Sequence, residues 1–420
     1  MQLLSRPFFG AAGLRTAETA RASTATASPR LLLVSELYPP DVGGSAVLLH
    51  EGYSRLGGDM TVVTDAATHI EGRTAAGARI VPAPIAMTRW GLINRRAATQ
   101  HLGLARRLRR LASSRDVVHC ARALPEGVAA WLSHLAGGAP YVCWSHGEDV
   151  TGALSSRELT FLMTRVYRGA SAVIANSRNT RSLLRELGVP SSRIHVVYPG
   201  VDPGRFTPAV DGTAIRQSLA PRSETVLLSV GRLQRRKGHD LAIRAVAALK
   251  REQRTIRYVI VGTGDERAYL QTLAADLGVT DRVWFAGEVS PEDLPRYYAA
   301  CDVFLLPNRI EQRDIEGFGI VFLEAAAAGR AVIGGRTGGV PEAVADGLTG
   351  VLVSGTDVDE LACVVRRLVC DRALAQRLGR AGRERVLKAF TWDQTAERIR
   401  AVHEGVLGRA PRRADEQGVD

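Results

Sequence analysis

Two glutamates, eight residues apart, flank a short apolar segment near the three-quarter point of the chain. Glu316 opens the glycine turn EGFG, and Glu324 follows in EGFGIVFLEAAAAG. An apolar helix is expected from Ile320 to Ala328, ending before Gly329. Glycine turns at a helix start leave N–H groups open to an anion. Both carboxylates can then face one pocket, and a helix cap plus one solvated glutamate is the simpler alternative.

A basic loop supplies the opposite charge. The segment SVGRLQRRKG carries Arg232 and Lys237 immediately after an apolar strand. Open α/β sheets bind ligands at the carboxyl ends of their strands, so both cations should enter a crevice there. A diphosphate is the natural partner for two such cations. The alternative, a solvated basic loop, loses weight beside the glycine turns at Gly43-Gly44 and Gly317–Gly319.

The strands that position these loops read as short apolar runs without alternation, which is typical of buried parallel strands. The first set is Leu31–Glu36, Met60–Thr64, Ala78–Val81, Asp116–His119, Pro140–Trp144, Ala172–Ala175 and His195–Val197. Proline and glycine at Tyr198–Asp202 interrupt the pattern, and a polar stretch runs to Ser223. The second set is Thr225–Gly231, Tyr258–Gly262, Val283–Gly287, Val303–Pro307 and Ala331–Gly334. Helical segments separate the strands, so we predict two open α/β domains that face one another.

Composition limits the remaining possibilities. The chain has 420 residues, enough for two or three domains, and it has ordinary apolar and charged content. No apolar run approaches the roughly 18 residues of a membrane span. The five cysteines lack metal-ligand spacing and fit buried thiols in a reducing cytoplasm. Residues 1–29 are interpreted as a disordered extension or a start codon placed too early, and residues 408–420 as a loose tail.

Five motifs in this order carry a family resemblance: YPPDVGG, HGED, GRLQRRKG, EGFG-x4-E and TGGVPE. Together they resemble family 4 retaining glycosyltransferases of GT-B fold, over about Leu31 to Leu407. The segment NRIEQRDIEGFG most resembles the mannosyltransferase branch that includes phosphatidylinositol mannosyltransferases. The implied fold is two facing Rossmann-like, doubly wound parallel-sheet domains with a cleft between them. The implied boundaries are an acceptor domain at 30–203, a donor domain at 204–391 and a crossover helix at about 392–407 that returns to the acceptor domain.

The resemblance also assigns roles to residues. Arg232 and Lys237 would hold the donor diphosphate, Glu316 the hydroxyls of the transferred sugar, and Glu324 the ribose. His146 matches the histidine at the sugar end of the cleft and, with Glu316, is the predicted catalytic residue. The other predicted substrate-binding positions are Gly43 and Gly44 in the acceptor-domain turn, Gly317, Phe318 and Gly319 in the donor-domain turn, and Gly262, Glu288 and Val289 towards the base.

The implied reaction is retaining transfer of a hexosyl group from a nucleotide-diphospho-sugar, with GDP-mannose as first expectation and UDP-sugars as second. The acceptor would be a glycan, a lipid or a lipid-linked molecule. No metal or cofactor is expected, because arginine, lysine and helix N-termini would stabilise the leaving diphosphate. The alternative function is a nucleotide-sugar epimerase or a non-catalytic nucleotide-sugar-binding protein of the same fold.

Three other motifs are interpreted as structural. Gly262-Thr263-Gly264-Asp265 lacks the third glycine and the acidic partner of a dinucleotide fingerprint. Asp357-Val358-Asp359 could bind a metal, but Asp357 with Glu360 is a capping box before a helix. His119, Cys120 and Cys143 end apolar strands and are expected in the core.

Positive charge gathers in the first half of the chain. The net charge is +12, and no acid occurs between Glu71 and Asp116. That segment holds Arg73, Arg79, Arg89, Arg95, Arg96, Arg106, Arg107, Arg109, Arg110 and Arg115, with Leu104, Leu108 and Leu111 spaced as one helix face. The alternatives are an ordinary solvated helix, or a surface for anionic lipid, lipid-linked acceptor or polyanionic glycan. We expect a cytoplasmic protein that can bind the inner membrane face peripherally, and no nucleic-acid partner, because no binding motif accompanies the arginines.

Overall fold

The computed structural model describes residues 31–40, 43–88, 90–112, 117–222, 224–252 and 255–408. The predictions for residues 1–29 and for the tail from 409 onward lie outside the described residues. So do residues 41–42 of the YPPDVGG turn, Asp116 at the start of a predicted strand, and two of the ten arginines, Arg89 and Arg115.

The N-terminal domain is built on an eight-stranded sheet in the order β3-β4-β2-β1-β5-β6-β7-β8. All neighbouring pairs are parallel except β3 with β4. Its strands are β1 Leu31–Val34, β2 Met60–Asp65, β3 Gly72–Arg73, β4 Arg79–Ala83, β5 Val117–Cys120, β6 Tyr141–Ser145, β7 Ala172–Ala175 and β8 Ile194–Val196. Its helices are α1 Gly44–Ser54, α2 Arg95–Leu111, η2 Ala123–Gly127, α3 Val128–Leu135, α4 Glu148–Ala153, α5 Arg157–Gly169, α6 Arg178–Glu186 and η3 Ser191–Arg193.

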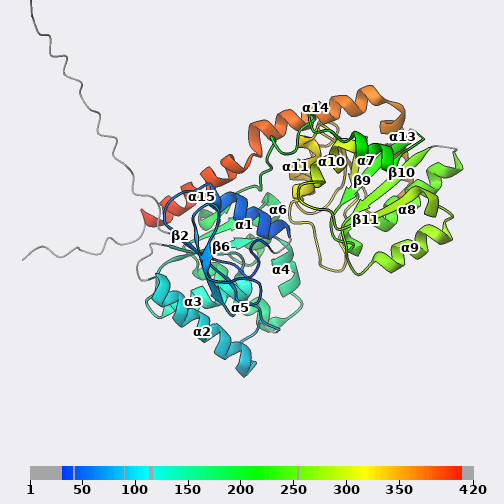
Figure 1. Cartoon of the computed structure of the whole chain (residues 1–420). Coiled ribbons are helices and arrows are strands. Elements are labelled where there is room, and N and C mark those ends of the chain that lie inside the picture. Colours follow the sequence, from blue (N-terminus) through cyan, green and yellow to red (C-terminus); the bar gives the residue numbers. More distant parts are fainter. Residues whose placement is uncertain are drawn as a thin grey trace, which may run out of the picture.

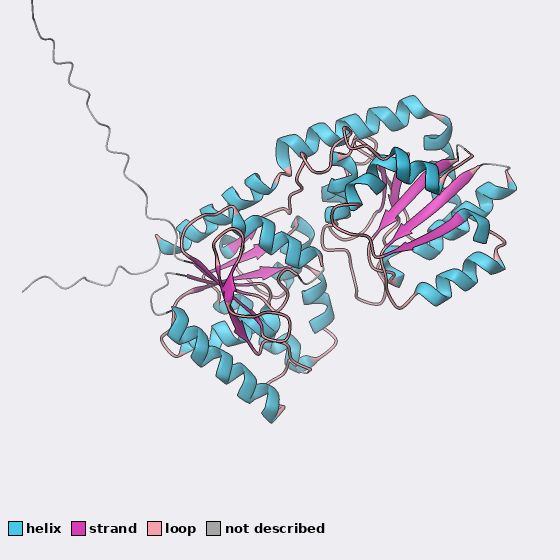
Figure 2. Cartoon of the chain, viewed as in Figure 1, coloured by secondary structure: helices cyan, strands magenta, loops and turns pink. Residues whose placement is uncertain are grey.

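The C-terminal domain has a six-stranded, all-parallel sheet in the order β11-β10-β9-β12-β13-β14. Its strands are β9 Thr225–Val230, β10 Ile256–Val261, β11 Val283–Gly287, β12 Val303–Leu306, β13 Ala331–Gly335 and β14 Val351–Val353. Its helices are α7 Thr213–Leu219, η4 Arg235–Lys237, α8 His239–Arg251, α9 Arg267–Asp276, η5 Thr280–Arg282, α10 Leu294–Ala300, α11 Ile320–Ala327, α12 Val340–Ala343, α13 Val358–Cys370 and α14 Arg372–Ala389. Helices cover the strands of both sheets (Figure 2).

The chain crosses between the domains twice, at neighbouring places. Val201, in the first connection, forms a parallel β-bridge with Thr391, in the second. The side chains of Tyr198, Phe318 and Phe390 pack on one another beside this point, with ring centroids 5.5–5.9 Å apart. Before the second connection, helix α14 runs along the C-terminal domain. After it, α15, Trp392–Leu407, lies on the N-terminal domain (Figure 1).

Apolar side chains on both faces of each sheet explain why the strands lack alternation. In the N-terminal domain, one face packs against α2, α3 and α5, and the other against α1 and α15, where Trp392, Ile399 and Val406 are buried. The C-terminal sheet is covered in the same way, by α8, α9 and α13 on one face and by α10 and α11 on the other. The fold class predicted from the sequence is therefore confirmed, and the predicted strands are present with small shifts at their ends. The sequence analysis missed β3 and β14, which have two and three residues.

The arginine-rich helix has the apolar face that the spacing of its leucines predicts. Leu104 and Leu108 of α2 are 3% and 0% exposed and belong to the domain core, and Leu111 packs against that core. The apolar face of α2 is therefore already occupied and cannot enter a membrane. The outward face carries Arg95, Arg96, Arg106 and Arg109. In the described part of the chain, no helix has the length and apolar character to cross a bilayer.

Candidate active site

The predicted site residues gather where the carboxyl edges of the two sheets face each other. The loop after β6, Ser145–Gly147, meets the loop before α11, Glu316–Gly319. A β-carbon placed on Gly317 would lie only 2.0 Å from the carbonyl oxygen of His146, so only glycine permits this contact. The Asn176 amide also donates to that carbonyl, at 3.1 Å. The two halves of the site thus touch through their backbones.

Glu316 is the centre of a buried charge cluster. Its Oε2 accepts hydrogen bonds from Lys237 Nζ at 2.5 Å, Arg236 Nη1 at 2.9 Å and Asn308 Nδ2 at 2.9 Å. The carboxylate, the lysine and the arginine are each less than 10% exposed. Arg236 also pairs with Asp314 at 2.9 Å. Three elements therefore converge on one carboxylate: η4, the end of β12 and the loop before α11.

The cluster keeps Glu316 ionised. Burial alone would raise the pKa of this carboxyl, but Lys237 and then Arg236 outweigh burial and hold the pKa below its usual value. One carboxylate oxygen takes all three donors, so the second oxygen remains available to a ligand hydroxyl. The contact between Glu316 and a sugar stays a prediction.

Arg232 differs from the buried Arg236 and Lys237 because its side chain is exposed, as is that of Arg235. It reaches the opposite domain: a β-carbon on Gly43 would lie 3.7 Å from Arg232 Nη2. A β-carbon on Gly44 would lie 4.0 Å from Ile320, the first residue of α11. The glycine turn of the N-terminal domain therefore faces both the basic loop and the start of α11, where an anion could be enclosed.

The start of α11 offers backbone donors. The N–H groups of Phe318, Gly319, Ile320 and Val321 donate to no acceptor among the described residues, and no side chain caps this end. The Phe318 ring is buried against Tyr198 and Phe390, so this residue presents only its backbone to the site. Unpaired N–H groups at a helix start attract negative charge.

Glu324 lies in α11, eight residues after Glu316, and has different partners. Its carboxylate accepts a hydrogen bond from Tyr298 Oη at 2.6 Å. Burial raises the pKa of Glu324, and the tyrosine bond only partly opposes that effect. The two glutamates therefore have separate polar contacts, and the predicted contact between Glu324 and a ribose stays a prediction.

The predicted base end lies along the carboxyl edge of β9, β10 and β11. Gly262 N donates to the Gly287 carbonyl at 2.7 Å, and a β-carbon on Gly262 would lie 2.1 Å from the Gly231 carbonyl. At Gly231, Gly262 and Gly287, the backbones of three neighbouring loops therefore pack directly against one another. This row of glycines extends from the basic loop to Glu288 and Val289. Glu288 is exposed and Val289 is half-buried against the core.

His146 is fixed from several directions. Its Nε2 lies 2.9 Å from the Ala121 carbonyl, its ring stacks on Trp144, and its N–H donates to Asp149. The neighbouring Glu148 forms an ion pair with Arg236 at 3.1 Å. This pair joins the N-terminal domain directly to the Glu316 cluster.

Sequence reasoning missed four residues of the site. Arg236, Asn308 and Glu148 were part of the quoted motifs but received no role, and Asp314 lay just before EGFG. A signal was available for Arg236 and Glu148, because each is a charged residue next to an assigned one. Asn308 follows a strand that was predicted, at the edge where ligands bind.

The motifs that we interpreted as structural have structural contacts. Asp357 caps α13 by accepting from Glu360 N at 2.9 Å, although the Glu360 carboxylate turns to Ser354 N and does not close the capping box. His119 is buried between Tyr53 and His403, at 2.7 and 3.1 Å. Cys120, Cys143 and Cys301 are buried as well, but Cys363 and Cys370 are exposed, so the expectation of five buried thiols is wrong for these two. Across the described ranges, no group of three or more His, Cys, Asp or Glu has an arrangement that could hold a metal.

The two facing α/β domains, with basic side chains and free N–H groups between the carboxyl edges of their sheets, have the architecture of GT-B glycosyltransferases. Residues 42–205 match the family model described as Glycosyltransferase Family 4, and residues 211–385 match the one described as Glycosyl transferases group 1. The chain belongs to the family 4 glycosyltransferases and is a glycosyltransferase.

Relatives with assigned names support this family. A GDP-mannose-dependent alpha-(1-6)-phosphatidylinositol monomannoside mannosyltransferase of Mycobacterium tuberculosis is 36% identical over 385 residues, which is 88% of this chain and 97% of the relative. A D-inositol 3-phosphate glycosyltransferase of Streptomyces avermitilis is 34% identical over 317 residues, covering 71% of this chain and 67% of the relative.

Solved structures show the same fold at low sequence identity. A sucrose-phosphate synthase of Thermosynechococcus elongatus aligns with a TM-score of 0.78 and 24% identity, over 90% of this chain and 99% of that one. HepE of Anabaena, solved in complex with UDP, aligns with a TM-score of 0.75 and 21% identity, over 90% and 100% of the two chains.

Proposed function

We propose that this protein transfers a mannosyl group from GDP-mannose, with retention of configuration, to a lipid-linked acceptor of the phosphoinositol-mannoside type. The observation that carries the proposal is the 36% identity, across both domains, to a relative named for that donor and acceptor. UDP-sugars are the second candidate donor, because a structural neighbour was solved with UDP. The relatives are named as transferases, which does not favour the epimerase or binding-protein alternative.

In this proposal, the donor diphosphate lies between Arg232, Lys237 and the N–H groups at the start of α11. Glu316 orients the sugar hydroxyls, Glu324 binds the ribose, and Gly262, Glu288 and Val289 receive the base. His146 and the glycine turn Gly43-Gly44 close the sugar and phosphate ends.

The bond between the anomeric carbon and the phosphate oxygen breaks as the acceptor oxygen bonds to that carbon from the same face. The acceptor proton passes to an oxygen of the departing diphosphate, so no protein nucleophile is needed. Cations and N–H groups already in place stabilise the leaving charge.

A nucleotide screen followed by a transfer assay tests the donor. If the donor is GDP-mannose, GDP should bind more tightly than UDP and raise the melting temperature more. A ligand at a hundredfold excess over its dissociation constant stabilises the folded protein by about 2.7 kcal/mol. Labelled GDP-mannose should then yield a labelled phosphoinositol mannoside, with epimerised nucleotide sugars sought in the same reaction. Stabilisation by UDP alone would move the proposal to UDP-sugars, and epimerised donor without transfer would overturn it.

We also propose that no metal takes part, because the two cations and the helix start supply the positive charge that the diphosphate needs. Transfer should persist in EDTA. Activity lost in EDTA and restored by magnesium or manganese would contradict this part alone.

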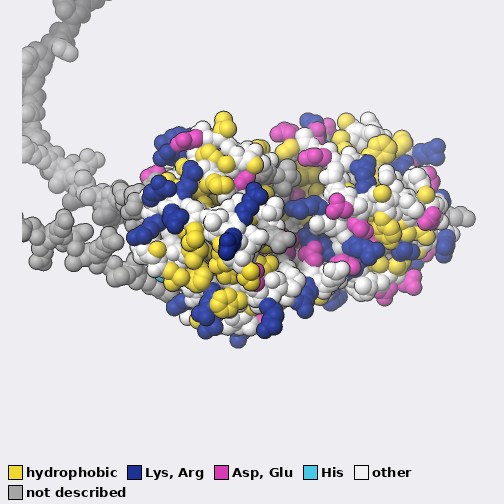
Figure 3. Space-filling view, turned by 90° about the horizontal axis from the view of Figure 1, so that it is seen from below, with side chains coloured by type: hydrophobic (Ala, Val, Ile, Leu, Met, Phe, Trp, Pro, Cys, Tyr) yellow, Lys and Arg dark blue, Asp and Glu magenta, His cyan; other side chains and the backbone are white. Residues whose placement is uncertain are grey.

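A peripheral membrane contact through α2 is the second proposal. Its support is the row of outward arginines beside the exposed side chains of Trp90, Ile93 and Leu102. Figure 3, seen from the side of the molecule on which α2 lies, shows basic and hydrophobic side chains with few acids over the N-terminal domain. Each arginine adds roughly 1 kcal/mol at an anionic surface, within about 8 Å at physiological salt.

Liposome co-sedimentation tests this contact. The protein should bind anionic vesicles at low salt and leave them at high salt, and changing Arg95, Arg96, Arg106 and Arg109 to glutamine should abolish binding. A matched variant with Arg244, Arg251, Arg377 and Arg380 changed to glutamine removes four exposed arginines from the other domain. Equal losses in both variants would show that only net charge matters and would overturn the assignment to α2.

A further inference from the structure

A second pocket lies at the opposite edge of the C-terminal sheet from the active site. It opens where β9, β12 and β13 begin, at Thr225, Val303 and Ala331, and has a volume of about 240 Å³. Strand β9 leads from this pocket to the basic loop, and six residues of strand span roughly 20 Å. The pocket is therefore separate from the donor site.

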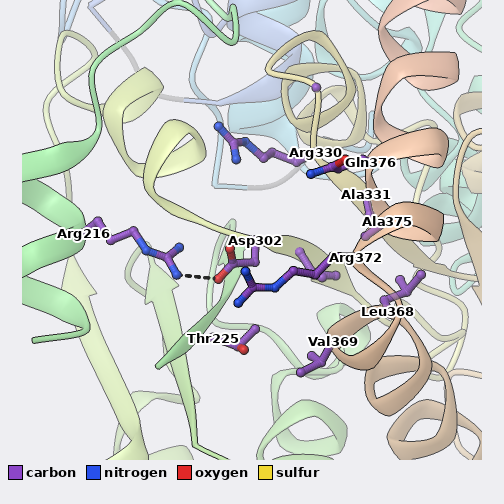
Figure 4. Close-up of a pocket in the computed structure, with 12 residues that line it drawn as sticks. Arg216, Thr225, Asp302, Arg330, Ala331, Leu368, Val369, Arg372, Ala375 and Gln376 are labelled. Carbon is purple, nitrogen blue, oxygen red and sulfur yellow. Dashed lines mark ion pairs between the residues drawn. The ribbon is translucent and has the colours of Figure 1, made fainter. Parts of the chain in front are cut away.

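Three arginines line this pocket from different parts of the chain: Arg216 from α7, Arg330 from the position directly before β13, and Arg372 from the start of α14 (Figure 4). Only Arg216 is neutralised. It pairs with Asp302 at 2.9 Å and donates to the carbonyls of Ala300 and Glu224.

The other two guanidinium groups have spare donors. Arg330 makes one hydrogen bond, to the Cys301 carbonyl at 3.0 Å, and its buried Nε has no partner in the part of the chain that the structure describes. Among the same residues, none forms an ion pair or hydrogen bond with the Arg372 side chain. Among the described residues, Arg330 and Arg372 therefore form no ion pair, because the one carboxylate that lines the pocket, Asp302, pairs with Arg216. Guanidinium forks match oxyanions.

Arg372 lies in the first turn of the 18-residue helix α14, whose start is already capped by the Asp371 carboxylate, which accepts a hydrogen bond from Leu374 N at 2.8 Å. The two guanidinium groups, and not the helix dipole, are therefore the features that favour an anion in the pocket. Gln376, one turn later, and Thr225 line the same space and add uncharged hydrogen-bonding groups.

Apolar side chains complete the lining. Val303, Ala331 and Leu368 are buried and form an apolar wall beside the polar groups. The volume is slightly smaller than the roughly 300 Å³ at which pockets for drug-sized ligands begin. A small carbon skeleton fits the wall while its charged group meets the arginines.

We propose that this pocket binds the phosphate group of a small phosphorylated metabolite, held by Arg330 and Arg372. The site is independent of the donor diphosphate, and its ligand stands apart from the transfer reaction. Inorganic phosphate shares the recognised chemistry and is the other source that the experiment distinguishes.

Hydrogen–deuterium exchange of the full-length protein tests the proposal, because it reads the two anion sites separately. Inorganic phosphate and glycerol phosphate are titrated in turn, with acetate as a singly charged comparison. Protection of the first turns of α14 reports the new pocket, and protection of residues 231–238 reports the donor site. We expect the α14 segment to be protected by both phosphates and not by acetate.

Arg372→Gln should raise the phosphate concentration needed to protect the α14 segment at least tenfold. The protection of residues 231–238 should stay the same. Arg380→Gln, an exposed arginine further along the same helix, is the matched control and should behave as wild type. Arg372 is itself exposed, so its replacement should fold, which circular dichroism checks. Glycerol phosphate binding more tightly than phosphate would support the metabolite, and equal affinities would assign the site to free phosphate. Undiminished protection in Arg372→Gln, or none in the wild type, would overturn the proposal.

Discussion

Two buried glutamates, one in each domain, have pKa values that are shifted in opposite directions. Glu316 has two cations at 2.5 and 2.9 Å, and its pKa is lowered. Glu126, in the N-terminal domain, has one cation, Arg122, at 3.5 Å, and accepts a hydrogen bond from Glu36 N at 2.8 Å. Burial dominates there and raises the pKa of Glu126 to about 7.

The difference shows that burial alone does not set the charge of a site. Both carboxylates are removed from water, and the number and closeness of their cations decide which one stays ionised. In the C-terminal domain, the two cations that contact Glu316 are neighbours in one loop, so both lie close to the same carboxylate. The N-terminal edge places Glu36, Glu126 and Glu148 around the single cation Arg122, whose own pKa is raised because these acids outweigh its burial.

Removing the charge of Glu316 should have the largest effect. Glu316→Gln leaves the buried Lys237 without its carboxylate, while Arg236 keeps Asp314 and Glu148. Removing one partner of a buried ion pair typically costs about 3–5 kcal/mol of stability. Transfer should fall by roughly 10²–10³, as when a positioned polar group is lost from an active site. Denaturant unfolding and initial rates measure both. The control is Glu311→Gln, a more exposed carboxylate of the same segment, and similar losses there would contradict a special role for Glu316.

The two predicted diphosphate ligands should separate under mutation. Arg232→Ala and Lys237→Ala should each weaken nucleoside diphosphate binding by about 1.5–3 kcal/mol, since each removes a charge-assisted contact. Only Lys237→Ala should also lower stability, because Lys237 neutralises Glu316 and Arg232 is exposed. Calorimetry with diphosphate and nucleoside checks the first point. Arg235→Ala, in the same loop, is the comparison, and unchanged diphosphate affinity in both test variants would reject the assigned site.

Glu126 should make stability depend on pH in the opposite sense from Glu316. The folded protein holds the Glu126 proton more tightly than the unfolded chain, so stability falls as pH rises from 4.5 to about 7. The full change corresponds to about 3 kcal/mol. Glu126→Gln cannot ionise, so its advantage over wild type should grow across this window. Melting temperatures at pH 5 and pH 8 test this, and a difference that does not vary with pH would show that Glu126 is already ionised in the fold.

The ion pair between the domains should matter least for stability. The Glu148 side chain is 52% exposed, and surface ion pairs contribute about 0–1 kcal/mol. Glu148→Gln should therefore change unfolding by less than about 1 kcal/mol. A loss as large as that expected for Glu316→Gln would mean that the two edges act as one cluster, and the comparison between them would fail.

Much of the fold followed from local patterns. Apolar runs such as Val303–Leu306 predict buried parallel strands because backbone pairing and burial act on contiguous residues. The loops at the strand ends also predicted the edge of the sheet at which Lys237 and Glu316 pair. The short strand Val351–Val353 was not predicted, because three residues are too few to show a periodic pattern.

Side-chain partners were harder to foresee. The spacing of Leu104 and Leu108 predicted an apolar face correctly, but it could not say whether core or membrane covers that face. The charge of Arg236 was visible, whereas its contacts with Glu148 and Glu316 join segments that lie far apart in the chain.

The sequence by itself determined two parallel-sheet domains and the composition of the loops at their carboxyl edges, since strand periodicity and glycine turns are short-range properties. Only the tertiary structure decided which carboxylate meets two cations, which meets one, and that Arg330 and Arg372 share a pocket whose one carboxylate, Asp302, pairs with Arg216. The physical reason is distance: electrostatic energy and desolvation depend on the spacing of atoms in space, and that spacing is fixed when separate elements pack.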